Sequence, residues 1–237
     1  MCHPALDAGS IYIDSCLRRN DEREWFTIKG VEIKKLEIVW QNSDVMVVNK
    51  PSGMVCVRED NPKKWPVVAH RLDKETSGCL LMAKNLKSLE FLMGQFKNRK
   101  IDKEYVALVH GWIEPKEGRM RLPLANGRVR YDGKMADTAW ETVKRFIKDE
   151  EKLSLLRLKI YTGRTHQIRV HLAHLGHPVF ADSKYLNKRQ MKKDRQVLSR
   201  HFLHARKIGF GLPDTGKDSG QARMTVTVEL PKELKIW

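Results

Sequence analysis

One short segment, HRLDKETSG at residues 70–78, carries the side chains best suited to chemistry. It sets a single aspartate, Asp73, beside an arginine and ahead of a small-residue bend, and GRTHQIR at residues 163–169 supplies further arginines. A carboxylate is a nucleophile only while it is ionised, and a nearby guanidinium stabilises that form in a buried site. Because no set of metal ligands accompanies it, Asp73 is a candidate nucleophile, and the arginines favour RNA as the substrate.

Four segments in this chain resemble, in the same order, the signature stretches of the RluA-type pseudouridine synthases. They are NKPSG at 49–53, HRLDKETSG at 70–78, KEY at 103–105 and GRTHQIR at 163–169. One such match is weak evidence, but four in order at plausible spacing are specific, and the resemblance covers roughly residues 37–230. It implies an enzyme that isomerises specific uridines of structured rRNA or tRNA to pseudouridine.

The reaction breaks the bond between base and ribose, turns the base and rejoins it through carbon, so it needs a nucleophile and a closed pocket but no cofactor. The resemblance makes Asp73 the nucleophile and Arg164 its charge partner. The uridine must first leave its stack. Arg71 matches the side chain that fills the gap, and Tyr105 the ring that packs on the flipped base and whose hydroxyl can assist proton transfer.

Each assignment has a plain structural alternative. Asp73 could cap the bend that follows it, Arg71 could form an ion pair with Glu75, and Tyr105 could be an ordinary core residue. Gly78 is expected to let the chain turn tightly, so that the loop presents Asp73. The resemblance places substrate-binding residues at Arg71, Ile168, Arg169, His70 and Thr76. Ile168 would also suit ordinary core packing.

The charge of the chain agrees with a polyanionic partner. Its 45 Lys and Arg against 29 Asp and Glu give a net charge of +16, spread along the sequence. The alternative is a solvated basic surface without nucleic-acid function. The four cysteines show no CxxC pair, which fits a reducing cytoplasm, and no apolar run is long enough for a membrane span. We expect a cytoplasmic monomer without an obligate protein partner.

Histidines at positions 166, 171, 174 and 177 raise the question of a metal site, because a helix would bring the last three to one broad face. Gly176 and Pro178 would end such a helix, and no cysteine or carboxylate completes a ligand set. We therefore expect no metal. A metal-dependent deaminase is disfavoured because the HxE plus CxxC pattern is missing. A catalytically silent RNA-binding or ribosome-assembly protein on the same fold is the main alternative function.

The pattern of residues predicts an α+β fold with a mainly antiparallel mixed sheet and flanking helices, as in the pseudouridine synthase catalytic domain. Residues 36–40 and 45–48 read as a hairpin, and Tyr105 to Trp112, Leu153 to Ile160 and Met224 to Leu230 read as strands. A helix begins after Asn85. Residues 123–134 form a basic loop or hairpin that touches RNA. Residues 1–35 are expected to be a poorly ordered extension without an S4-type domain, of which Trp25 to Ile33 could still form an edge strand, and 36–237 the catalytic domain.

Overall fold

The computed structural model describes residues 25–29, 36–59, 65–213 and 222–236. Its first strands are β1 (Trp25–Lys29), β2 (Glu37–Gln41), β3 (Val45–Lys50), β4 (Val55–Glu59), β5 (Val67–Val68) and β6 (Ser77–Ala83). The later strands are β7 (Asp102–His110), β8 (Glu117–Ala125), β9 (Arg128–Val129), β10 (Lys134–Lys148), β11 (Glu151–Ile160), β12 (Leu203–Gly211) and β13 (Arg223–Thr227). The helices are α1 (Leu86–Lys97), α2 (Gln167–His174) and α3 (Lys188–Val197), followed by a 3-10 turn at Lys232–Leu234. No helix in these ranges is long and apolar enough to cross a membrane.

All thirteen strands of the described residues belong to one sheet, in the order β4-β1-β5-β6-β12-β7-β11-β10-β8-β9, with β13 beside β12 and the β2–β3 hairpin beside β6. Strands β6 and β12 run parallel, whereas the other described ladders are antiparallel. Every residue of β6 is buried, as expected for a central strand covered on both faces. The predicted α+β class, the mainly antiparallel sheet and the β2–β3 hairpin are confirmed.

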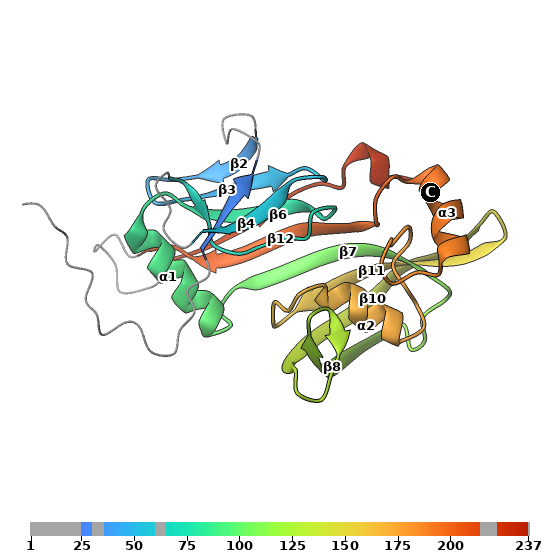
Figure 1. Ribbon diagram of the computed structural model, residues 1–237. Helices are drawn as coiled ribbons and strands as arrows, with labels where there is room; N and C mark the ends of the chain where they lie inside the picture. The colour runs from blue at the N-terminus through green and yellow to red at the C-terminus, as the bar shows by residue number, and fades with distance from the viewer. Residues whose placement is uncertain (1–24, 30–35, 60–64, 214–221, 237) are drawn as a thin grey trace, which may run out of the picture.

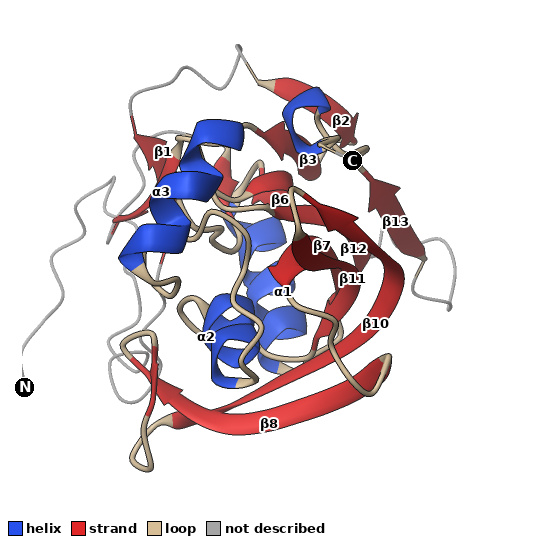
Figure 2. Ribbon diagram, turned by 90° about the vertical axis from the view of Figure 1, so that its right-hand side faces the viewer, coloured by secondary structure: helices blue, strands red, loops and turns tan. Residues whose placement is uncertain are grey.

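The sheet has two halves that meet where β12 pairs with β7 (Figure 1). Helix α1 packs on β6 and β12 in one half, and α2 packs on β10 and β8 in the other. Figure 2 shows the long strands β8 and β10 curving around the side on which α2 lies. The connection from β5 to β6 carries the HRLD motif, and GRTHQIR spans the end of the connection from β11 and the first residues of α2. Each half of the sheet therefore contributes one motif.

Helix α1 begins as its sequence predicts. The side chain of Asn85 accepts a hydrogen bond from the backbone N–H of Ser88, and the Asn85 backbone in turn bonds to the Ser88 hydroxyl, which forms a capping box. Leu89 and Leu92, which form an apolar stripe along the helix, are buried against the sheet. Interior packing of this stripe holds α1 in place, because an isolated helix of this length is marginal in water.

The extension predicted for residues 1–35 falls largely outside the described residues. Its segment Trp25–Lys29, however, forms β1 and pairs with both β4 and β5. The sheet therefore begins before residue 36.

Gly78 has a different role from the one its sequence context indicated. It lies within β6 rather than in a turn, with a φ of +112°, and a Cβ on it would lie 2.2 Å from the carbonyl oxygen of Ala205 on β12. Only glycine permits this close approach of the parallel pair.

We expect Gly78→Ala to lower the free energy of unfolding by about 2–3 kcal/mol, because backbone cannot move aside cheaply. Gly94→Ala is the matched control. Nothing lies within 4 Å of a Cβ built on Gly94, inside α1, so this change should stabilise the protein by about 0.5–1 kcal/mol. Urea denaturation of both variants measures the difference, and equal effects would contradict the assignment.

Candidate active site

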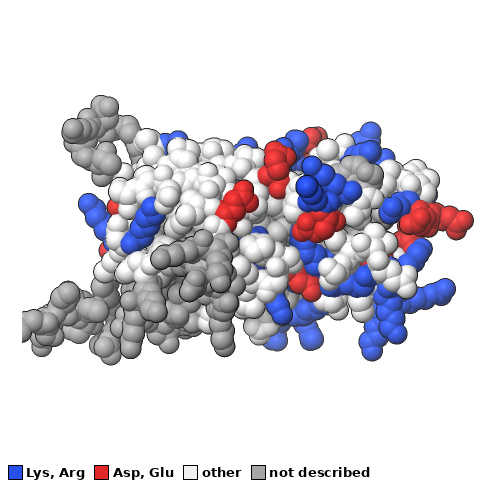
Figure 3. Space-filling view, turned by 90° about the horizontal axis from the view of Figure 1, so that it is seen from above, with Lys and Arg blue, Asp and Glu red and all other residues white. Residues whose placement is uncertain are grey.

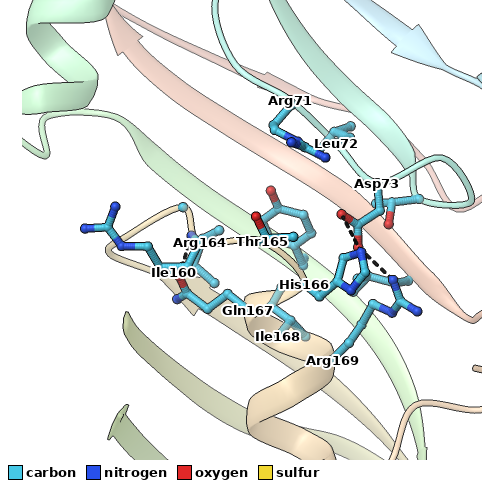
Figure 4. Close-up of a pocket in the computed structure, with 14 residues that line it drawn as sticks. Arg71, Leu72, Asp73, Ile160, Arg164, Thr165, His166, Gln167, Ile168 and Arg169 are labelled. Atoms are coloured by element: carbon cyan, nitrogen blue, oxygen red, sulfur yellow. Dashed lines mark hydrogen bonds and ion pairs between the residues drawn. The ribbon is translucent and has the colours of Figure 1, made fainter. Parts of the chain in front are cut away.

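A pocket opens over the junction of the two halves of the sheet. The HRLD loop forms one wall and residues 163–169 form the other (Figure 4). Tyr105 of β7 and Leu203 of β12 also line the pocket. All of the site residues predicted from the sequence line this pocket except His70. The two motifs, distant in the sequence, therefore contribute to one cavity.

The NKPSG segment supports the loop that holds Asp73. Lys50 is fully buried, and its ammonium group donates hydrogen bonds to the carbonyl oxygens of Pro51, Met54 and Lys74 at 3.0–3.2 Å. Burial lowers the pKa of Lys50 to about 8. The backbone N–H of Gly53 donates a further bond to the Lys74 carbonyl. These bonds hold Lys74, the residue that follows Asp73, in place. The NKPSG segment therefore supports the loop that carries the HRLD motif.

Asp73 pairs with Arg169 rather than with Arg164, so the predicted charge partner is wrong. Arg169 Nη1 lies 3.0 Å from Asp73 Oδ2, whereas Arg164 Nε reaches only the carbonyl oxygen of Met135, at 3.4 Å. Figure 4 shows Arg169 directed toward Asp73 and Arg164 directed away from it. The physical reason is the turn before α2, in which Gln167 accepts a bond from the Arg164 backbone and fixes its direction.

Arg169 is itself held by a second carboxylate. Its Nε and Nη2 donate to Asp182 Oδ2 and Oδ1 at 2.7 and 2.8 Å, and both side chains are buried. Burial disfavours the charge of Arg169, but its bonds to Asp182 and the charge of Asp73 raise its pKa above the ordinary value. Asp182 also accepts bonds from the backbone N–H groups of Lys184 and Tyr185. Arg169 was predicted to bind substrate, but these bonds leave it little capacity to do so.

Tyr105 is both a core residue and part of the pocket wall. It is 7% exposed and belongs to the same apolar cluster as Leu72 and Ile168. Burial and the charge of Asp73 raise the pKa of the Tyr105 phenol, which therefore stays protonated at neutral pH. Part of the Tyr105 ring is therefore packed in the core, as the structural alternative predicted. The part that lines the pocket can stack on a flat base. Ile168 likewise combines core packing with pocket lining.

His70 and Thr76, both predicted to bind substrate, bond within the protein. His70 Nε2 accepts a bond from the Leu81 backbone, its ring packs on Phe96, and burial lowers its pKa to about 3, so it carries no charge for a phosphate. The Thr76 hydroxyl lies 2.9 Å from His201 Nε2. His70 lines a cleft beside the pocket, whereas Thr76 lines the pocket itself.

The histidines that raised the metal question bond to other groups. His171 Nδ1 meets the Thr138 hydroxyl, and His177 Nδ1 meets the carbonyl oxygen of His110. Within the described residues, one trio could hold a cation, namely His110, Glu151 and Asp194, whose ligand atoms lie within 4.8 Å of one another. Its members also bond to each other and to Gln190, outside the pocket.

A basic cleft adjoins the pocket and shares Arg71, Tyr105 and Arg164 with it. Its further lining includes Arg99 and Lys103, and burial lowers the pKa of Lys103 to about 8. Seen from above in Figure 3, lysine and arginine side chains gather toward the right of the view, with acidic side chains among them. The cations of the cleft can bind phosphates next to the pocket.

Sequence reasoning missed two residues of the site. His166 lies beside Asp73, with 3.9 Å between Nε2 and Oδ1. Asp182 is linked to Asp73 through Arg169, which bonds to both carboxylates. Ala181, which immediately precedes Asp182, has a φ of +59°, the left-handed backbone region that favours glycine.

Comparisons with known proteins agree with this geometry. The RNA pseudouridylate synthase family profile matches residues 44–174. An uncharacterized RNA pseudouridine synthase of Mycoplasma genitalium is 38% identical over 77% of this chain and 64% of its own length. An uncharacterized RNA pseudouridine synthase of Aquifex aeolicus is 33% identical over 84% of this chain and 71% of its own length. Ribosomal large subunit pseudouridine synthase C of Escherichia coli is 32% identical over 76% of this chain and 63% of its own length.

Among solved structures, human RNA pseudouridylate synthase domain containing 1 superposes with a TM-score of 0.66 at 26% identity, over 84% of this chain and 85% of its own. The chain spans about two thirds of the length of the first curated relatives that it matches. The family profile covers more than half of the chain, and it includes both motifs that meet in the pocket. The chain therefore belongs to the RNA pseudouridylate synthase family.

Proposed function

We propose that this protein isomerises specific uridines of structured RNA to pseudouridine, with Asp73 as the nucleophile. The observation that carries the proposal is a half-buried Asp73 carboxylate, ion-paired with Arg169, beside a pocket walled by Tyr105 and Ile168. Such a site joins an ionised nucleophile to an apolar slot for a base. The substrate is an rRNA or tRNA stem-loop, and rRNA is the first to examine because relatives are named as ribosomal large subunit synthases.

In the proposed reaction, the target uridine leaves its stack and enters the pocket. Arg71, exposed at the pocket entrance, fills the vacated stack, and Tyr105 packs on the base. Asp73 attacks either the ribose carbon or the uracil ring, so that the bond from ribose to nitrogen breaks. The base then turns and rejoins through carbon. Glu75, the alternative ion-pair partner of Arg71, bonds to Arg195 and His201.

Pseudouridine mapping in cellular RNA tests the proposal. Cells with the gene, cells without it and cells that carry the Asp73→Asn form are compared. We expect one or a few sites that depend on the gene and that the Asn form does not restore. RNA that binds the protein but shows no gene-dependent pseudouridine would instead identify a catalytically silent RNA-binding protein.

RNA affinity should fall steeply as salt rises, with log K linear in log salt, because Lys and Arg displace counterions from phosphates. Arg99→Ala removes one cation of the basic cleft and should reduce the slope by about 0.7–0.9. Lys144→Ala on β10, which lines neither the pocket nor the cleft, is the control and should leave the slope unchanged. Filter binding from low to physiological salt measures both. A flat titration would contradict RNA as the main partner.

A further inference from the structure

His166 occupies an unusual position beside Asp73. It immediately precedes α2 with φ and ψ of 55° and 24°, a left-handed region that is uncommon for residues other than Gly, although Asn, Asp and His are enriched there. Its Nε2 lies 3.9 Å from Asp73 Oδ1, and it lines the pocket (Figure 4). A backbone conformation of this kind places the imidazole over the nucleophile, where an ordinary first helical residue would point elsewhere.

The hydrogen bonds of His166 fix which ring nitrogen carries the proton. Its Nδ1 lies 2.8 Å from the Tyr185 hydroxyl, and that hydroxyl donates to the carbonyl oxygen of Gly127 at 2.7 Å. A carbonyl can only accept, and the hydroxyl has a single proton. Both bonds form together only if Nδ1 is the donor to Tyr185. The neutral imidazole therefore has its lone pair on Nε2, on the side of Asp73.

The surroundings keep this imidazole neutral. Burial lowers the pKa of His166 below its ordinary value of 6.5, and the charges of Arg169 and Lys184 lower it too, while those of Asp73 and Asp182 oppose them. At neutral pH the Nε2 lone pair is consequently free to accept a proton.

Formation of pseudouridine requires such an acceptor. Once C5 of uracil is joined to the ribose carbon, the hydrogen on C5 must leave as a proton so that its electron pair returns to the ring. Tyr105 is a poor acceptor, because its raised pKa means that no phenolate is available at neutral pH. Of the two residues, only His166 presents an unprotonated basic atom to the pocket.

We propose that His166 Nε2 accepts the C5 proton in the last step of the reaction. This inference rests on the proposed function. The C5–H bond breaks, a bond from Nε2 to hydrogen forms, and the resulting imidazolium is stabilised by the carboxylate of Asp73. Nitrogen N1 of the base gains one proton, from the imidazolium or from water, so that the product is an isomer of the substrate. Tyr185 is a positioning residue that holds Nδ1 as the donor.

Two substitutions test the assignment while keeping the backbone. His166→Asn and His166→Gly both suit a positive φ, so the fold should persist. Asn can still donate to Tyr185 but has no basic atom, and Gly leaves room for added imidazole. We expect turnover to fall about 10²–10⁴-fold in both, with RNA affinity within a few-fold of the parent. His174→Asn, an exposed histidine of α2 outside the pocket, is the matched control and should behave as the parent.

Three readouts separate catalysis from a structural role. Deuterium at C5 should slow the His166 variants more than the parent, because deprotonation becomes rate-limiting in them. Imidazole should restore the Gly variant in proportion to its unprotonated fraction. In the parent, activity should fall as the pH drops below the lowered pKa of His166, and this limb should vanish in the Asn variant.

Parent-like turnover in the Asn variant, or a loss without an isotope effect and without imidazole rescue, overturns the role of His166. If instead the parent releases no C5 hydrogen from any uridine-containing RNA, the proposed function fails and this inference fails with it.

Discussion

Asparagine in place of Asp73 is expected to abolish isomerisation, with turnover reduced by about 10⁴-fold or more. A neutral amide has no anionic oxygen to attack the substrate. RNA affinity should stay within a few-fold of the parent, because the cations of the basic cleft are untouched. The fold should also persist, since Arg169 keeps both of its bonds to Asp182. Single-turnover assays and calorimetric melting on the same preparation measure the two effects.

Asp149→Asn is the matched control for this change. Asp149 is exposed in the turn between β10 and β11 and has a φ of +48°, a conformation that asparagine also adopts well. The activity of the Asp149→Asn variant should equal that of the parent. Measurable multiple turnover by the Asp73 variant would show that another group is the nucleophile.

The second large effect concerns the buried pair of Arg169 and Asp182 beside Asp73. Asp182→Asn should lower the free energy of unfolding by about 3–5 kcal/mol, because the charge of Arg169 loses its main partner in a buried site. Activity should fall as well, since the guanidinium that orients Asp73 is no longer held. Urea denaturation monitored by tryptophan fluorescence gives the first value, and rates measured well below the melting temperature give the second.

A double variant separates these two consequences. Arg169→Met with Asp182→Leu removes both charges of the buried pair and replaces them with apolar groups, so part of the stability should return while activity stays low. The return is partial because the backbone N–H groups of Lys184 and Tyr185 lose their acceptor. If activity returned with stability, the pair would be a structural element only.

The same pair carries a pH dependence of stability. Arg169 holds the pKa of the Asp182 carboxyl below its ordinary value of 3.8, although burial alone would raise it. A carboxyl whose folded-state pKa is depressed contributes stability that is fully present above 3.8 and is lost as the pH falls through the folded-state value. The parent should therefore lose stability below pH 3.8 more steeply than the double variant.

Short-range sequence patterns predicted those elements that depend only on a few neighbouring residues. The β2–β3 hairpin and the start of α1 at Asn85 follow from β-branched runs and from a capping signal, both of which act over a few residues. The role of Gly78 could not be found in this way, because it depends on the approach of β12 from the far end of the chain. The long strand β10 was missed because its polar and apolar residues follow no simple alternation.

The same distinction applies to the site. The motifs identified the loop that carries Asp73 and the segment that carries its partner, but not which arginine of that segment turns toward it. That choice depends on a left-handed residue at His166 and on the bonds of Gln167, which fix the two arginines on different sides of the turn. A sequence pattern places residues along the chain, whereas the direction of a side chain is set by backbone dihedral angles.

The separation of Asp73 from Arg169 has a consequence for protein synthesis. The two residues are 96 positions apart, and β6, which follows the Asp73 loop, needs β12 as its parallel neighbour. A nascent chain that has reached only β11 therefore exposes the carboxylate without its counter-charge and without one wall of the pocket. Because such distant contacts form late, a growing polypeptide acquires the complete site only after α2 and β12 have been synthesised. Truncated translation products should accordingly be inert toward RNA chemistry even when much of the sheet is present.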